Sequence, residues 1–201
     1  MKLLTVLKRP TKVCPICNKE ITRPTLLIDS LICHDCLSKM KVIMKSFKVE
    51  GVKALALYNY NSDVRGLIYQ YKGLNDLMLQ DIFLSPFLSF LKAKYKNYTI
   101  CYPPSFSDNH NAFLFSSLNL KMQDLFYKEV PYKQSSMPFE KRHEISKVIK
   151  LKNKPQITSY LLVDDVMTSG ETIKACIKLL KDNHVKQIKV LLISLNNHTL
   201  D

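Results

Sequence analysis

The stretch SYLLVDDVMTSGETIKACIKLLKDNHVKQIKVLLISL, residues 159–195, decides the fold. Residues 159–165 form a nearly continuous apolar run that ends in two acids, and residues 187–195 form a second apolar run. Both runs have the length and apolar content of buried strands, and residues 171–182 between them have the spacing of an amphipathic helix. Two strands joined so closely by a helix run parallel, through a right-handed crossover. The sequence therefore predicts an α/β fold with a mostly parallel sheet flanked by helices.

Shorter segments upstream extend this pattern. Apolar runs bounded by polar residues predict strands, and segments with helical spacing predict helices. The expected elements are strands at 54–60 and 98–102, helices at 62–72 and 111–120, and a helix over 76–94 that Pro86 kinks or divides. Residues 128–154 are polar and basic, and we expect a loop there with one helical turn at 139–149.

Length and composition allow one main domain with a small appendage. The chain has 201 residues, of which 46% are hydrophobic, enough to bury one medium core. Four of the six cysteines fall within the first 36 residues. We expect a zinc-ribbon module with four cysteine ligands over residues 1–40, a linker or short joining helix over 41–53, and the α/β domain over 54–201.

The sequence predicts a cytoplasmic protein that does not insert into a membrane. Its opening MKLLTVLKRP lacks the apolar stretch of a signal peptide, and no apolar run of about 18 residues occurs. Cytoplasmic thiols stay reduced, so the cysteines are interpreted first as metal ligands or core residues. We interpret the two isolated downstream cysteines, Cys101 and Cys176, as core residues.

The four N-terminal cysteines have the spacing of a metal site. Cys14 and Cys17 form one Cys-x2-Cys pair, Cys33 and Cys36 form a second, and 15 residues separate the pairs. Two tight turns of this kind each present two thiolates to one tetrahedral Zn²⁺, which leaves no open position for catalysis. The sequence predicts structural zinc, with a redox pair or an iron–sulfur centre as the alternatives.

A candidate phosphate loop follows the first buried strand of the deciding stretch. In open α/β sheets, ligands bind beyond the carboxyl ends of the strands, where loops lead into helix N-termini. Residues 166–170 are the expected loop, and its hydroxyls, backbone N–H groups and helix N-terminus are suited to a phosphate. The candidate ligand-binding residues are Asp164, Asp165, Thr168, Ser169, Gly170, Glu171 and Thr172.

The two adjacent acids indicate what accompanies the phosphate. Carboxylates repel phosphate, so their natural partners are a pair of vicinal hydroxyls or a magnesium ion held beside a diphosphate. Ribose 5-phosphate offers the hydroxyls together with a phosphate at a suitable distance. The alternative is that residues 168–172 only cap the helix and that Asp164 and Asp165 are a solvated strand end.

The segment LLVDDVMTSGETI, residues 161–173, resembles the phosphoribosyl pyrophosphate motif of type I phosphoribosyltransferases. With the upstream CPIC and CHDC pairs, the chain resembles the ComF family of late-competence proteins, of the ComFC type. The resemblance implies a phosphoribosyltransferase-like domain that binds phosphoribosyl pyrophosphate with Mg²⁺. It also implies a role in uptake or processing of single-stranded DNA during natural transformation, beside a helicase-type competence ATPase.

Further segments resemble the family in part. YQYKG at 69–73 resembles a Lys-Gly element that follows an early helix, and Gln134 and Arg142 resemble parts of a mobile loop that closes over the ligand. The proline pair at 103–104 matches the pyrophosphate-binding side in outline. Between residues 98 and 120, however, His110 is the only basic side chain available to a departing pyrophosphate.

The sequence therefore leaves enzyme activity open. One alternative is an active type I phosphoribosyltransferase that transfers ribose 5-phosphate to a base or an amine. Another is a ligand-sensing regulatory protein that binds DNA or a partner and performs no turnover.

The charge favours a polyanionic partner. Lys and Arg number 30 against 17 Asp and Glu, a net charge of +13, which attracts nucleic acid or anionic lipid. The basic segment at 141–154 could bind phosphate backbones without reading sequence. Aromatic residues just upstream could stack on bases, namely Tyr127, Tyr132 and Phe139, with Tyr69, Tyr71, Tyr95 and Tyr98 as alternatives. The alternative is an ordinary solvated loop in a Lys-rich protein. The candidate DNA contacts are Lys141, Arg142, Lys147, Lys150, Lys152 and Lys154.

Overall fold

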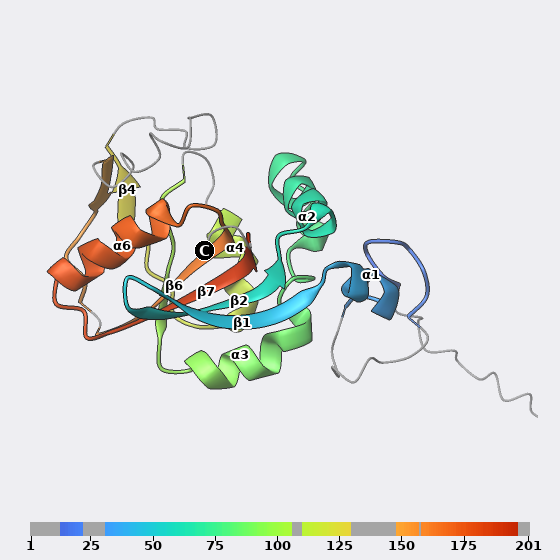
Figure 1. The fold of residues 1–201 in the computed structure, drawn as a ribbon, viewed down its shortest axis with the longest axis horizontal. Coiled ribbons are helices and arrows are strands. Elements are labelled where there is room, and N and C mark those ends of the chain that lie inside the picture. The colour runs from blue at the N-terminus through green and yellow to red at the C-terminus, as the bar shows by residue number, and fades with distance from the viewer. Residues whose placement is uncertain (1–12, 22–30, 106–109, 130–147, 157, 197–201) are drawn as a thin grey trace, which may run out of the picture.

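The computed structural model describes residues 13–21, 31–105, 110–129, 148–156 and 158–196. Its centre is a five-stranded sheet with the strand order β1-β2-β7-β6-β3 (Figure 1). The strands are β1 (Val42–Val49), β2 (Val52–Asn59), β3 (Thr99–Cys101), β6 (Ser159–Met167) and β7 (Gln187–Leu195). Within this sheet β1 runs antiparallel to β2, and every other neighbouring pair is parallel. The mostly parallel sheet expected from the sequence is confirmed.

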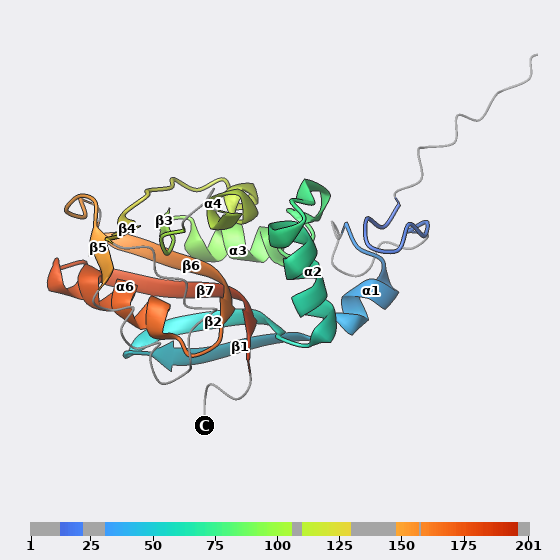
Figure 2. The ribbon, with the colours of Figure 1, turned by 90° about the horizontal axis from the view of Figure 1, so that it is seen from above.

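Helices cover both faces of the sheet (Figure 2). The helix α6 (Glu171–Asp182) covers one face, and α2 (Ser62–Gly73), α3 (Leu88–Tyr95) and α4 (His110–Leu114) contribute to the core on the other. Two apolar cores result, one on each side, and the central strands β2, β7 and β6 are apolar on both faces. Among the described residues, no helix is long and apolar enough to cross a membrane.

The unit β6-α6-β7 forms as predicted, with one difference at the end of β6. Leu161 and Val163 face the core on the α3 side, and Leu162 faces the core under α6. The strand continues to Met167, where the sequence had predicted a loop from Val166 onward, because β7 pairs with β6 as far as the Met167–Leu195 pair. The loop before α6 is therefore only three residues long, 168–170.

Residues 41–53 are not a linker or a joining helix, as the sequence had suggested. Val42–Val49 form β1, which pairs with β2 as an edge strand of the main sheet. Glu50 and Gly51 make the turn between them, and both have positive φ, 48° and 74°. A two-residue turn with both central φ values positive is the usual connection of a tight hairpin. Exposed lysines interrupt the apolar pattern of β1, which is why the sequence pattern missed it.

Two predicted helices differ from the structure. The predicted helix over 76–94 is α-helical only from Leu88, because two short 3-10 turns, η1 (Leu77–Leu79) and η2 (Ser85–Phe87), precede α3. The predicted helix over 111–120 is α4 followed by η3 (Ser116–Leu118).

The predicted loop 128–154 contains strand structure: β4 (Phe126–Lys128) ends at its first residue, and β5 (Ile149–Leu151), near its end, pairs antiparallel with β4. Most of the helical turn predicted at 139–149 lies outside the described residues.

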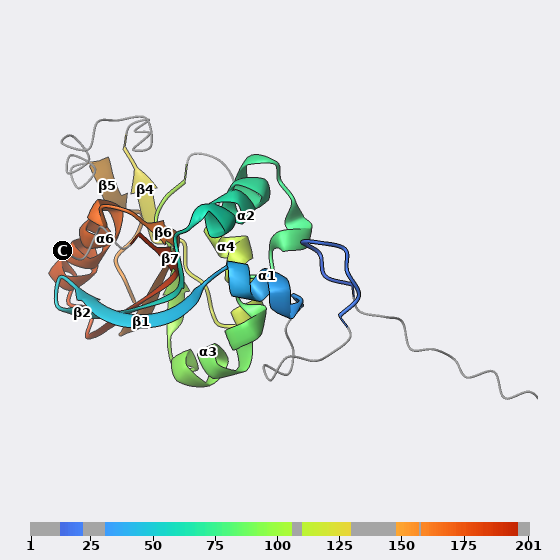
Figure 3. The ribbon, with the colours of Figure 1, turned by 45° about the vertical axis from the view of Figure 1, so that its right-hand side comes forward.

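The cysteine-rich segment packs against the main domain through α1 (His34–Lys39) (Figure 3). Ile32, Leu37 and Met40 are buried in the same core as residues of β2 and α2. The Leu31 N–H donates to Ser85 Oγ at 3.3 Å, and Asn61 Nδ2 donates to the Lys39 carbonyl oxygen at 2.8 Å. This segment therefore shares a core with the sheet.

Candidate functional site

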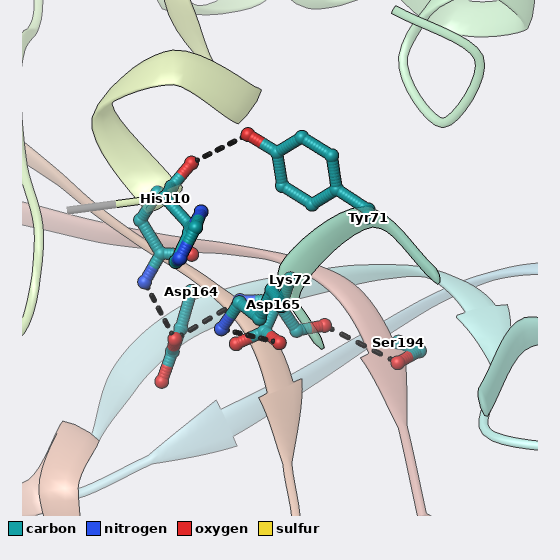
Figure 4. A network of polar contacts seen from close by, with 7 residues as sticks. Tyr71, Lys72, His110, Asp164, Asp165 and Ser194 are labelled. Carbon is teal, nitrogen blue, oxygen red and sulfur yellow. Dashed lines mark hydrogen bonds and ion pairs between the residues drawn. The ribbon is translucent and has the colours of Figure 1, made fainter. Parts of the chain in front are cut away.

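Two acids at the carboxyl end of β6 lie at the centre of a polar network (Figure 4). Asp165 faces α2, where its Oδ2 lies 2.7 Å from Lys72 Nζ. Asp164 Oδ1 accepts hydrogen bonds from Asn111 Nδ2 at 2.9 Å and from the Asp165 N–H at 3.0 Å. The hydroxyl of Ser194 donates to the Asp165 carbonyl oxygen at 3.2 Å. Side chains from α2, α4 and β7 thus hold the acid pair in place.

The ion pair with Lys72 makes the two acids electrostatically different. The side chains of Asp165 and Lys72 are only 12% and 32% exposed. Burial alone would raise the pKa of Asp165, but the Lys72 ammonium lowers it below its ordinary value. Burial, and then the neighbouring Asp165 charge, raise the pKa of Asp164 to about 7. Near neutral pH, Asp165 is therefore ionised and paired with Lys72, whereas the pH lies close to the pKa of Asp164, which has no cationic partner of its own at hydrogen-bond distance among the described residues.

The raised pKa of Asp164 predicts a pH dependence of stability. The folded protein holds this proton more tightly than the unfolded chain does, so stability is lost as the pH rises from about 4 to about 7. The variant Asp164→Asn keeps an oxygen that accepts from Asn111 and cannot ionise. We expect it to be more stable than the wild type by roughly 1–3 kcal/mol at pH 8, with a smaller difference at pH 5.5. Urea unfolding at both pH values measures this, and a variant less stable than the wild type at pH 8 contradicts it.

The loop after β6 forms a small polar hollow of about 90 Å³ at the N-terminus of α6. All seven residues predicted to bind the ligand lie at this end of β6, and every one except Asp165 lines the hollow. Gly170 has φ 76°, and a Cβ there would lie 3.2 Å from Met167 Cε, so the turn requires glycine. Ser169 Oγ is buried and forms no hydrogen bond within the described part of the chain. A buried hydroxyl without a partner costs free energy that a bound oxyanion or water would recover.

Glu171 is paired at the start of α6. Its Oε1 accepts from Lys174 Nζ at 2.7 Å, and Lys174 also lies beside Gly170. A free carboxylate at this position would repel a phosphate, and the ion pair offsets that charge. The sequence pattern identified Glu171 but missed Lys174.

Three more residues of the site were not predicted as ligand contacts. Lys72 belongs to the YQYKG segment, so the sequence held a signal for it, but its pairing with Asp165 required the fold. Asn111 is a buried amide on α4 that no motif marked. Lys128 ends β4, and although burial lowers its pKa, the nearby Asp164 charge opposes that shift. Cations from α2 and β4 therefore lie near the acid pair.

The predicted DNA-contacting segment is only partly described. Lys150 Nζ lies 4.0 Å from Glu129 Oε2, and Lys152 pairs with Asp124 across the β4–β5 ribbon. Lys154 is exposed. The other predicted contacts and the candidate mobile-loop residues lie outside the described residues, namely Gln134, Lys141, Arg142 and Lys147.

The four N-terminal cysteines form a cluster that could hold one metal ion. The Sγ atoms of Cys14, Cys17, Cys33 and Cys36 all lie within 4.8 Å of one another, and Cys17 Sγ is 3.6 Å from Cys33 Sγ. Tetrahedral coordination with metal–sulfur bonds of about 2.3 Å places the sulfurs about 3.8 Å apart. A turn at Cys14–Asn18 supplies one pair, and Cys33 precedes the first residue of α1. The geometry fits a closed site with four thiolate ligands.

The chain is similar to competence protein ComFC of Streptococcus pneumoniae. The two are 29% identical over 184 residues, which cover 88% of this chain and 77% of that protein. The match agrees with the resemblance carried by the cysteine pairs and the VDDVMTSGET segment, and that resemblance is confirmed. No family model matches the chain.

Several solved structures of phosphoribosyltransferases are similar to the chain. Adenine phosphoribosyltransferase from Saccharomyces cerevisiae has a TM-score of 0.43 at 12% identity, covering 82% of this chain and 91% of that one. The enzyme from Giardia lamblia has a TM-score of 0.41 at 14% identity, covering 82% and 97%.

Proposed function

We propose that the chain is a ComFC-like competence protein that assists uptake or processing of single-stranded DNA in natural transformation. In this proposal, residues 164–172 bind phosphoribosyl pyrophosphate or another ligand with a ribose 5-phosphate group. The similarity to ComFC supports the process, and the site at the end of β6 supports the ligand. The proposed process places the protein in the cytoplasm, where a helicase-type competence ATPase is the expected partner.

The arrangement of Asp164 beside the polar hollow is the observation that carries the ligand assignment. The hollow offers backbone N–H groups and the hydroxyls of Thr168, Ser169 and Thr172 at the N-terminus of α6, which suits a phosphate dianion. Asp164 lines the same hollow and titrates near neutral pH. Its carboxylate is suited to accept hydrogen bonds from vicinal ribose hydroxyls, or to bind Mg²⁺ beside a diphosphate.

The cysteine cluster is proposed to hold structural Zn²⁺. The supporting observation is the set of four mutually close thiols, two of them buried. Zn²⁺ with four thiolates has a filled coordination shell, so its role is to stabilise the segment around α1.

A second candidate function is phosphoribosyl transfer with release of pyrophosphate. Lys128 near Asp164 favours it, because it supplies an ammonium group where residues 98–120 contain no lysine or arginine. Pyrophosphate release from phosphoribosyl pyrophosphate in the presence of a nucleobase would support turnover. Ligand binding without release would favour a sensing role.

Natural transformation of the host organism tests the proposed function. Cells that carry Asp164→Asn/Asp165→Asn in place of the wild-type chain are expected to yield far fewer transformants from marker DNA. Cells that carry the exposed pair Asp63→Asn/Asp182→Asn, with the same charge change, are expected to transform normally. If deletion of the chain leaves the number of transformants unchanged, the proposed process is wrong.

A further inference from the structure

Three lysines form a row at the amino ends of the parallel strands, the end of the sheet opposite the ligand hollow. Lys48 of β1 is the register partner of Lys53 of β2. Lys53 and Lys189 each come one residue before the paired residues Ala54 and Val190, so Lys189 of β7 continues the row. All three side chains project from the face of the sheet that carries α3. Leu55 and Leu191, two residues after Lys53 and Lys189, belong to the core on that face, and Lys48 pairs with Lys53.

The lysine row lies in an open groove between the sheet and the end of α3. Figure 1 shows α3 running beside β1 and β2 on this face. The groove has a volume of about 610 Å³, and Lys94, Tyr95 and Tyr98 line its other side. The Tyr98 ring is partly exposed and packs edge-on against Tyr95 at 5.9 Å between centroids. Four lysines and a partly exposed aromatic ring therefore share one groove.

The groove lysines carry no acidic counter-charge from the described residues. No ion pair joins Lys48, Lys53, Lys94 or Lys189 to a carboxylate there. Burial, then the charges of Lys53 and Lys94, lower the pKa of Lys189. Like charges directly opposite each other on neighbouring strands are destabilising. The row therefore costs stability in the free protein, and an anion in the groove would offset that cost.

Two lysines of the predicted DNA-contacting segment differ in this respect. Lys150 and Lys152 are each paired with an acid, Glu129 and Asp124 respectively. A phosphate would have to compete with these carboxylates for the two ammonium groups. The groove lysines have no such competitor among the described residues. Charge complementarity therefore favours the groove as the anion-binding surface.

We propose that this groove, formed by Lys48, Lys53, Lys94 and Lys189 with Tyr98, binds the backbone of single-stranded nucleic acid. Neighbouring strands lie about 4.8 Å apart, so the row presents ammonium groups at short, regular intervals to successive phosphates. The exposed part of the Tyr98 ring offers a surface on which a base can stack. The inference rests on the proposed DNA-handling function and places its polymer site at the opposite end of the sheet from the ribose 5-phosphate site.

Anisotropy of a labelled 20-nucleotide oligodeoxythymidylate, titrated with metal-loaded full-length protein over a range of salt concentrations, tests the proposal. The variant Lys48→Gln/Lys53→Gln/Lys189→Gln is expected to bind roughly 10- to 100-fold more weakly, and its log–log salt slope should fall by about 2. It should also melt at a higher temperature than the wild type, since the like charges are gone. The matching arginine variant should retain the affinity.

The control variant Lys45→Gln/Lys121→Gln/Lys178→Gln removes the same charge from exposed positions outside the groove. It is expected to bind within about twofold of the wild type, apart from a general charge effect. If both triple variants lose the same affinity for the oligonucleotide, or if the groove variant binds like the wild type, the groove is not the DNA-binding site. The proposed function is unaffected by either result. A wild type that does not bind the oligonucleotide overturns both the groove and the proposed function. If the groove variant no longer binds phosphatidylglycerol vesicles but binds the oligonucleotide like the wild type, the groove binds a lipid surface instead.

Discussion

Removal of the proposed Zn²⁺ from the cysteine cluster is expected to produce the largest loss of stability in the molecule. Elemental analysis should find one Zn²⁺ per chain, and a strong chelator should lower the melting temperature by about 10 °C or more. Ile32, Leu37 and Met40 are buried in a core that continues under β2 and α2. When the thiolates lose their common ligand, the segment around α1 loses its anchor and exposes that core.

Two cysteine variants separate metal binding from packing. Cys36→Ser removes one of the four clustered thiols and should abolish stoichiometric zinc. Cys176→Ala removes a fully buried thiol of α6, far from the cluster in sequence, and should retain one zinc despite some loss of core packing. A protein that contains no zinc, or whose melting is unchanged by chelation, contradicts the assignment.

The fold was predictable where local sequence pattern and burial agree. The β6-α6-β7 unit is apolar on both faces of its strands and amphipathic along its helix, so its period and length identified it. The four cysteines were equally predictable as a group, because two Cys-x2-Cys pairs at this separation are typical of one metal site, and the structure brings all four together. In these parts the local pattern and the tertiary structure point to the same answer.

The sequence was insufficient where side chains from distant segments meet. β1 is an edge strand rich in exposed lysines, so it lacked the apolar run by which strands are recognised. The pairing of Lys72 with Asp165 joins residues 93 positions apart, and Asn111 reaches Asp164 from a third element. Hydrophobic periodicity and motif spacing describe residues that are close along the chain. The contacts of Lys72 and Asn111 with the acid pair depend instead on where α2 and α4 lie on the sheet.

The second large effect is expected on ligand binding. Asp164→Asn/Asp165→Asn should weaken binding of phosphoribosyl pyrophosphate with Mg²⁺ by at least about 100-fold. Asp164 is proposed to accept hydrogen bonds from two ribose hydroxyls, and hydrogen bonds to charged groups contribute about 1.5–3 kcal/mol each. Loss of the Asp165 charge also leaves the half-buried Lys72 without its partner. Asp164→Asn alone preserves that ion pair and provides a folded variant in which the loss of affinity is expected to persist.

Calorimetric titration of phosphoribosyl pyrophosphate with Mg²⁺ into the zinc-loaded protein therefore tests the central claim most directly. Asp63→Asn/Asp182→Asn, two exposed acids away from the hollow, is the matched control. Saturable binding at one site per chain, retained by the control and lost in both Asp164 variants, is the predicted result. Absence of binding by the wild type, or equal binding by all four proteins, would contradict the assignment of residues 164–172 as a ribose 5-phosphate site.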